Sequence, residues 1–279
     1  STSFFNDDFF KIWAGKKIDK KVPFVIYQHG GLYGQSKFSF PEYHEIKVSN
    51  YYLTWGWSKN KQTKVKPIGY IKKTIKRNKV LKDKILLVIH NAPRYTITID
   101  SYPGGSQWIY YFEDILTFIE RLPERIIKRL VVKLYPYDYG WDVEKRLKDR
   151  FPHLKISPKN ITFDEHLKNT SLIICGWNST TFLEGMVSNI PTLAFWNKKY
   201  FPLRISAQKE YKLLNKVNIF HNSPIDAAKH LIIIEDKIDL WWEKIDVVNA
   251  KNKFLLQYAM INDIPKMLTK FISSHINKH

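Results

Sequence analysis

Short apolar runs without internal alternation recur along the chain, and each is followed by a turn. The clearest lie at residues 24–27, 85–89, 130–134, 172–175 and 191–195. Uninterrupted runs of this length are typical of strands covered on both faces, whereas a half-exposed strand alternates apolar and polar residues. We therefore predict buried strands at these positions and a further short strand at residues 154–156.

The segments between these runs have the spacing of amphipathic helices. Residues 108–121 place apolar side chains every three or four positions, at Ile109, Phe112, Ile115, Leu116 and Ile119. We predict further helices at residues 141–150, 162–169 and 179–188, from about residue 225 onward, and in the tail at residues 252–276. Strands that alternate with helices in this way predict a doubly wound α/β domain built on a parallel sheet.

The N-terminal part of the chain has a related but shorter pattern. The strand at residues 24–27 leads directly into a glycine-rich turn, residues 28–34 (QHGGLYG), and residues 51–57 (YYLTWGW) have the same shape. A strongly basic stretch at residues 72–84 separates this part from the next strand. We interpret that stretch as an exposed linker or helix.

Composition indicates a folded chain with a basic surface. Hydrophobic residues make up 44% of the 279 residues, which is enough for a substantial core. The 45 Lys and Arg against 26 Asp and Glu give a formal net charge of +19, which attracts polyanions such as anionic lipid, nucleic acid or anionic substrates. Lysine is spread along the whole chain, and this usage can equally reflect the base composition of a genome.

The single cysteine, Cys175, excludes an intramolecular disulfide and a cysteine-based metal cluster, and it fits a reducing cytoplasm. No apolar run approaches the roughly eighteen residues that a membrane helix needs. The first residues lack the basic and apolar segments of a secretory signal. They also lack an initiator Met, which suggests processing or excision from a longer chain.

Candidate binding residues follow the apolar runs, where parallel sheets bind ligands. The segment at residues 175–184 (CGWNSTTFLE) ends a strand, turns at a glycine and starts a helix. Unpaired amides at the helix start, with the hydroxyls of Ser179, Thr180 and Thr181, can hold a phosphate or carboxylate. Asn178 and Ser179 also suit a plain helix cap, and both interpretations stay open.

Two other strand ends carry weaker candidates. Lys133 and Tyr135, before Pro136, deliver a cation and a hydroxyl, although a surface lysine and a packed tyrosine look the same in sequence. His29, beside two glycines, can approach a phosphate or a sugar hydroxyl, or it can be satisfied by the backbone of its loop. The run at residues 85–89 ends in His90 and Asn91, to which we assign no role.

Several motifs of other enzyme classes are missing from the sequence. It contains no Gly-x-x-x-x-Gly-Lys-Ser/Thr loop, no His-Glu-x-x-His pair and no Gly-x-Ser-x-Gly nucleophile turn. It also lacks Asp-x-Asp, the metal-binding signature of the other large glycosyltransferase architecture. We therefore predict a donor site that needs neither a metal ion nor a cofactor.

Taken in order, these motifs resemble the GT-B glycosyltransferases. The resemblance rests on residues 28–34, 54–57, 134–141 and 178–184, together with the Pro191 that starts the next strand. These segments are most similar to bacterial surface-carbohydrate biosynthesis transferases, a group related in plan to Kdo and sialic acid transferases and to teichoic-acid glycerophosphotransferases. The resemblance implies a GT-B-like fold, with most of the acceptor-side domain outside the chain.

The resemblance also implies a domain plan. Residues 1–80 would be the end of an N-terminal Rossmann-like domain with a linker, so that the chain would be the C-terminal part of a longer enzyme. Residues 81–235 would be the nucleotide-sugar-binding domain, and the helices at residues 236–279 would pack back on the first domain.

Site roles follow from the same resemblance. In the Kdo and sialic acid relatives, a Lys-x-His-Pro element and a Ser-Ser/Thr element bind CMP. Here Lys133 and Tyr135 stand in the first, with tyrosine in place of histidine, and Ser179 and Thr180 stand in the second. Glu184 would hold a ribose hydroxyl or support the loop. His29 is the candidate for a catalytic or acceptor-side role.

The function expected from this plan is transfer of an ulosonic acid from a CMP-activated donor to a surface glycan. The expected partners are a nucleotide-activated sugar and a glycan or lipid-linked acceptor, with peripheral contact at an anionic inner membrane face and no specific nucleic acid. Two alternatives stay open. One is transfer of a polyol phosphate from a CDP-alcohol, and the other is a non-catalytic basic module that binds anionic polymer or membrane.

Overall fold

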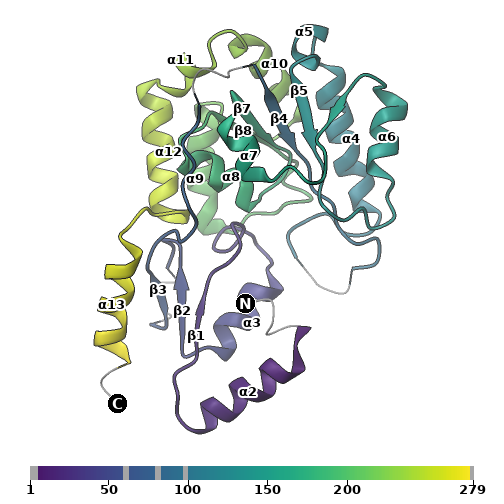
Figure 1. Ribbon diagram of the computed structural model, residues 1–279. Coiled ribbons are helices and arrows are strands. Elements are labelled where there is room, and N and C mark those ends of the chain that lie inside the picture. The colour runs from purple at the N-terminus through teal and green to yellow at the C-terminus, as the bar shows by residue number, and fades with distance from the viewer. Residues whose placement is uncertain (1–5, 59–62, 79–82, 97–99, 277–279) are drawn as a thin grey trace.

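The computed structural model describes residues 6–58, 63–78, 83–96 and 100–276. The strands form two parallel sheets, one of three strands and one of six, which lie in two parts of the molecule (Figure 1). The two chain ends both lie at the end of the molecule that holds the smaller sheet (Figure 1).

The larger sheet has the strand order β6-β5-β4-β7-β8-β9, and all of its strands are parallel. Its strands are β4 (Ile85–Val88), β5 (Leu130–Lys133), β6 (Lys155–Ile156), β7 (Leu172–Cys175), β8 (Thr192–Phe195) and β9 (Phe220–His221). Every residue of β4, β7 and β8 is buried, as their uninterrupted apolar runs predict. The strand order reverses between β4 and β7, which creates the topological switch point of a doubly wound sheet.

Helices cover both faces of this sheet. They are α4 (Gln107–Glu120), α5 (Glu124–Ile127), α6 (Val143–Arg150), α7 (Phe163–Lys168), α8 (Thr180–Val187), α9 (Ile205–Lys216), α10 (Pro224–Ile234), α11 (Ile238–Trp242) and α12 (Ile245–Tyr258). Because the sheet grows in both directions from its switch point through right-handed crossovers, α4 and α8 lie on opposite faces. α10 packs on α4, and α12 packs on α8 and α9.

The smaller sheet consists of β1 (Val25–Tyr27), β2 (Tyr51–Thr54) and β3 (Val65–Pro67), paired in parallel in that order. In the described residues, the helices α2 (Asp8–Asp19) and α3 (Phe40–Val48) precede β2. The last helix, α13 (Ile264–His275), runs from the end of α12 down beside this sheet (Figure 1). There Phe271 packs with Leu53 and Ile68 in a small hydrophobic cluster.

The basic stretch at residues 72–84 is an irregular linker in its described part. Most of its described residues are exposed, but Ile75 is buried and its amide donates to the Ser188 hydroxyl at 3.0 Å. Arg77 forms an ion pair with Asp239 at 2.6 Å. The linker is therefore packed against α8 and α11.

Polar side chains fix the surroundings of α7 and α8. Asn189, with a φ of 53°, follows α8, and its Oδ1 accepts from Trp242 Nε1 at 3.0 Å and from Lys251 Nζ at 2.5 Å.

His166 on α7 accepts from Lys84 Nζ through Nδ1 at 3.1 Å, so its Nε2 carries the proton and donates to a serine hydroxyl. Burial lowers the pKa of His166 to about 4.

Candidate functional site

The carboxyl ends of β4 and β7 meet the glycine-rich turn of the smaller sheet at the start of α8. The Gly31 amide donates to Thr180 Oγ1 at 2.9 Å, although 149 residues separate the two in sequence. A Cβ on Gly31 would lie 2.6 Å from Thr180 Cα, so only glycine allows the two backbones to approach this closely. The turn at residues 28–34 therefore belongs to the same site as the start of α8.

The start of α8 uses several of its hydroxyls internally. Ser179 is the N-cap, and its Oγ accepts from the Phe182 amide at 3.3 Å and lies 2.6 Å from Thr181 Oγ1. Ser179 is 1% exposed, and the Thr180 hydroxyl faces Gly31. Among the contacts of the described residues, the amides of Thr180 and Thr181 have no acceptor, so the anion-binding capacity of this helix start resides in its backbone.

A buried network joins the glycine-rich turn to α9. The Tyr211 hydroxyl lies 2.6 Å from Gln35 Oε1 and 3.3 Å from Asn178 Oδ1, and Gln35 Nε2 donates to the Gly31 carbonyl. Asn178 is itself buried. Its side chain therefore helps to hold the turn in place.

An ion pair strengthens this junction. Arg204, at the start of α9, contacts both carboxylate oxygens of the buried Glu42 at 2.9 Å, and Glu42 also accepts from the Gly34 amide at 2.7 Å. A paired and hydrogen-bonded carboxylate is the form in which a buried charge is tolerated. The pair links α3 of the smaller sheet to α9 of the larger one.

The remaining predicted donor residues make their contacts in different parts of the structure. Glu184, one turn into α8, forms an ion pair with Lys72 of the linker at 2.5 Å. Lys133 Nζ donates to the Ile161 carbonyl at 2.7 Å, and burial lowers its pKa. Tyr135 is half-buried and lies near the switch point, with its ring centroid 6.3 Å from that of His90.

His90, at the carboxyl end of β4, is a polar residue of the site that the sequence did not single out. Its ring stacks on Trp177 with a centroid distance of 4.2 Å, and it is 6% exposed. Neither ring nitrogen has a partner among the described residues. Burial lowers the pKa of His90 to about 3, so the ring is neutral and presents one donor and one acceptor.

Aromatic rings surround His90. They belong to Tyr102, Tyr111, Tyr135, Trp177 and Phe201. A small pocket of about 40 Å³, lined in part by Asn91, Tyr135 and Lys159, opens beside the ring. One rule could have found His90: it directly follows the β4 run, as Gly176 and Trp177 directly follow β7.

His29 is the second residue of the glycine-rich turn at residues 28–34. Its Nδ1 is 3.4 Å from Glu45 Oε1, and its Nε2 is 3.2 Å from the Tyr33 hydroxyl. Burial lowers the pKa of His29 and raises that of Glu45, which is fully buried and also accepts from the Tyr52 hydroxyl. The Glu45 carboxylate and the Tyr33 hydroxyl therefore lie close to the two nitrogens of the imidazole.

His29 and Lys72 line a largely apolar pocket of about 400 Å³. Because Lys72 also pairs with Glu184, this pocket adjoins α8. Within the described residues, no group of three or more His, Cys, Asp or Glu is arranged to hold a metal ion. No helix in the same part of the chain has the length and apolar character needed to cross a membrane.

Comparison with known proteins assigns this chain to a protein family. The model of the LIC12162 family of transferases matches residues 1–272. The chain belongs to this transferase family. No curated protein matches it.

Solved structures similar to this family member share its fold. The structure of TarM superposes with a TM-score of 0.51 at 14% sequence identity, covering 89% of this chain and 49% of TarM. HepE from Anabaena, solved in complex with UDP-glucose, gives a TM-score of 0.52 at 10% identity, covering 94% of this chain and 75% of HepE. The chain thus spans about half the length of TarM. The predicted GT-B-like fold is confirmed.

The predicted site residues of this transferase fall into two groups. Asn178, Ser179, Thr180 and Thr181 lie together at the start of α8, next to the turn that carries His29. Lys133 points toward the loop that precedes α7, and Glu184 points toward the linker.

Proposed function

We propose that this protein is a GT-B-type glycosyltransferase that binds a nucleotide-activated sugar at the switch point between β4 and β7. The observation that carries the proposal is the buried His90, whose ring nitrogens have no partner among the described residues and whose ring stacks on Trp177, in the turn that leads into α8. A polar side chain this deeply buried is normally hydrogen-bonded, and a ligand group would supply the missing partners.

The chemistry of the site suits a leaving group that carries phosphate. The free amides and the positive dipole end of α8 would hold negative charge, and neutral His90 would donate one hydrogen bond to a phosphate or base oxygen. The aromatic surface of Trp177 and Tyr135 would contact a nucleobase or ribose. In this arrangement Lys133 holds the loop before α7 through its hydrogen bond to the Ile161 carbonyl, and its ammonium does not contact the donor.

Calorimetric titration with CMP, CDP, UDP and GDP tests the proposal. The variant His90→Phe keeps the stacked ring and removes both nitrogens. His230→Phe is the matched control, because His230 also packs against a tryptophan, Trp241, with a centroid distance of 5.0 Å, and its Nε2 is also unpaired. We expect one nucleotide to bind preferentially, and His90→Phe to weaken it by about tenfold or more while the control leaves it unchanged.

Two results would contradict the donor site. One is unchanged nucleotide affinity in His90→Phe, and the other is a folded wild-type protein that binds none of the four nucleotides. Where CMP or CDP binds, product analysis decides the reaction. A CMP-activated ulosonic acid would give a glycoside, whereas a CDP-alcohol would give a phosphodiester.

We further propose that His29 acts on the acceptor side. Glu45 orients its imidazole, and the pocket shared with Lys72 gives an acceptor hydroxyl room to approach. His29→Gln is expected to lower kcat by roughly a hundredfold or more while leaving donor affinity within about twofold. An equal loss of donor affinity would assign His29 to donor binding instead.

A further inference from the structure

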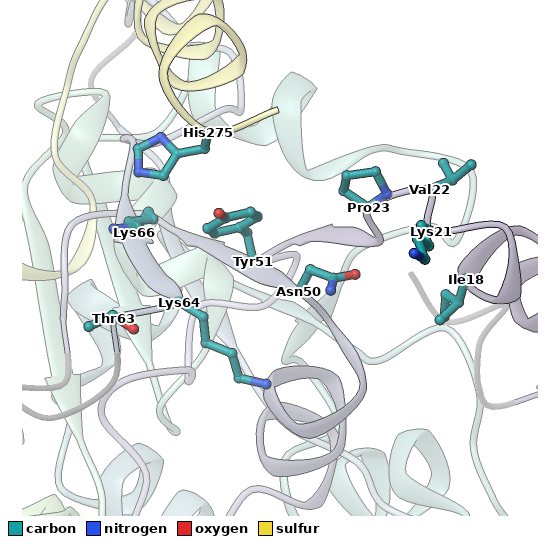
Figure 2. A pocket seen from close by; sticks show the side chains of 10 residues that line it. All are labelled: Ile18, Lys21, Val22, Pro23, Asn50, Tyr51, Thr63, Lys64, Lys66 and His275. Atoms are coloured by element: carbon teal, nitrogen blue, oxygen red, sulfur yellow. The ribbon is translucent and has the colours of Figure 1, made fainter. Parts of the chain in front are cut away.

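Another pocket lies at the end of the smaller sheet where its strands begin (Figure 2). Its volume is about 590 Å³, and it opens between the end of α2, the starts of β2 and β3, and the end of α13. Its lining residues are Ile18, Lys21, Val22, Pro23, Asn50, Tyr51, Thr63, Lys64, Lys66 and His275. The glycine-rich turn follows the opposite, carboxyl end of β1, so this basic pocket is separate from the donor site.

The lining of the basic pocket is cationic, and none of the described residues that form it is acidic. In the described part of the chain, Lys21, Lys64 and Lys66 form no ion pair with any acidic side chain. Like charges that share a pocket repel one another, and an anion that neutralises them is favoured.

Several donors of the basic pocket are held in place before any ligand arrives. Lys64 Nζ donates to the carbonyls of Lys47 and Ser49 at 3.3 Å and 3.0 Å. The Asn50 Oδ1 accepts from the Phe24 amide at 2.7 Å, which leaves its Nδ2 group to donate elsewhere. Such preorganisation lowers the entropy lost when a ligand binds.

One wall of the basic pocket is rigid and aromatic. The ring of Tyr51 packs edge-on against Phe271 at 5.2 Å and against His275 at 5.3 Å. Ile18, Val22 and Pro23 form an apolar side across from it (Figure 2). A pocket of this size and lining accommodates more than an inorganic anion, because it offers surface for an attached carbon skeleton.

We propose that the basic pocket binds the phosphate group of a phosphorylated glycan or lipid, independently of the donor site. Lysine ammoniums act as point charges with several donors, which suits a phosphate with up to two negative charges. The apolar side chains would then contact the glycerol or sugar that carries the phosphate.

Methyl NMR on the full chain tests this site with two ligands. The probes are glycerol 3-phosphate and phosphatidylcholine vesicles with and without phosphatidic acid. The Ile18 methyl reports on the basic pocket, and the Ile115 methyl, beside Gly176, reports on the donor side. The test variant is Lys66→Gln with Lys21→Asn, because asparagine tolerates the left-handed backbone of residue 21, whose φ is 59°. The matched control is Lys229→Gln, an exposed lysine of α10.

We expect glycerol 3-phosphate to shift the Ile18 methyl saturably without moving that of Ile115. The double variant should weaken binding by about tenfold or more, and the control should not. Binding only of vesicles that contain phosphatidic acid, lost in the double variant, would identify a lipid headgroup as the source of the phosphate. The inference is overturned if neither probe moves Ile18, or if the variant binds either probe as well as the wild type. Should Lys66→Gln fail to fold, Lys21→Asn alone gives the same test.

Discussion

The contact between Gly31 and Thr180 gives the sharpest test of how the smaller sheet meets α8. In Gly31→Ala the new Cβ would meet the Thr180 backbone at 2.6 Å to Cα and 2.8 Å to N. A backbone atom cannot rotate away as a side chain can, so the turn must shift and the hydrogen bond to Thr180 Oγ1 must stretch. Overpacking of this kind costs about 1–3 kcal/mol.

The neighbouring glycine provides a control for the general effect of alanine. A Cβ on Gly30 would lie 3.6 Å from the Tyr33 ring, which is an ordinary contact. Neither glycine has a φ in the left-handed region, so alanine restricts the unfolded chain alike at both positions and stabilises by about 0.4–1 kcal/mol. We therefore expect Gly30→Ala to be neutral or slightly stabilising, and Gly31→Ala to be destabilising by about 1–2 kcal/mol.

Thermal unfolding followed by circular dichroism measures the difference. For a chain of this size, about 1 kcal/mol corresponds to roughly 2–4 °C in Tm. Nucleotide titration of the same two samples shows whether the shifted turn also disturbs the donor site. Equal Tm values for the two alanine variants would refute the close approach of Gly31 to Thr180, whatever the nucleotide result.

Three further changes test hydrogen-bonded polar groups by denaturant unfolding. Asn189→Ala should destabilise by about 2–4 kcal/mol, because it loses two hydrogen bonds and strains a left-handed residue, whereas Asn189→Gly should lose only the bonds. Glu42→Ala should cost about 3 kcal/mol by leaving Arg204 without its partner, and a loss below about 1 kcal/mol would argue against the pair. The pKa of His166 is lower in the folded than in the unfolded state, so the unfolded state takes up the proton first and stability falls as the pH drops from about 6.5 to 4. His166→Asn should remove up to about 3 kcal/mol of that acid sensitivity, and an unchanged pH profile would contradict it.

The large sheet could be predicted from sequence because burial on both faces leaves a distinct pattern. β4, β7 and β8 are buried at every position, so their apolar runs are uninterrupted. The sequence of the smaller sheet gives a weaker pattern from which to predict its strands. β3 consists of Val65, Lys66 and Pro67, and its pairing with β2 is a tertiary contact without a local signal.

The sequence pattern also failed to predict the helices α9 and α3, because their burial depends on tertiary contacts that leave no clear local signal. α9 buries Ala207, Tyr211 and Leu214 at helical spacing, but polar and charged residues surround them in sequence. α3 buries Glu42 and Glu45, which a reading based on apolar residues assigns to the surface. Only the partners of these carboxylates, which lie far away in sequence or on other elements, explain their burial.

The site itself was predictable in place more than in detail. Strand ends locate the start of α8, but sequence cannot tell which hydroxyl caps the helix and which faces a ligand. The Ser179 hydroxyl is used as the cap, and Lys133 is bound by a carbonyl 28 residues away. His90 could be located from its place after the β4 run, but its burial without a partner among the described residues shows only in the structure.

Contacts from the smaller-sheet side reach α8 at its start, its middle and its end. Gly31 contacts Thr180, Lys72 contacts Glu184, and the amide of Ile75 contacts Ser188. A donor phosphate at the free amides of α8 would lie within this interface. Binding and domain packing would then share one coupling free energy, and thermodynamic linkage makes that coupling reciprocal. A change that fully releases the turn from α8 would then weaken donor binding by the same factor by which donor binding tightens the turn.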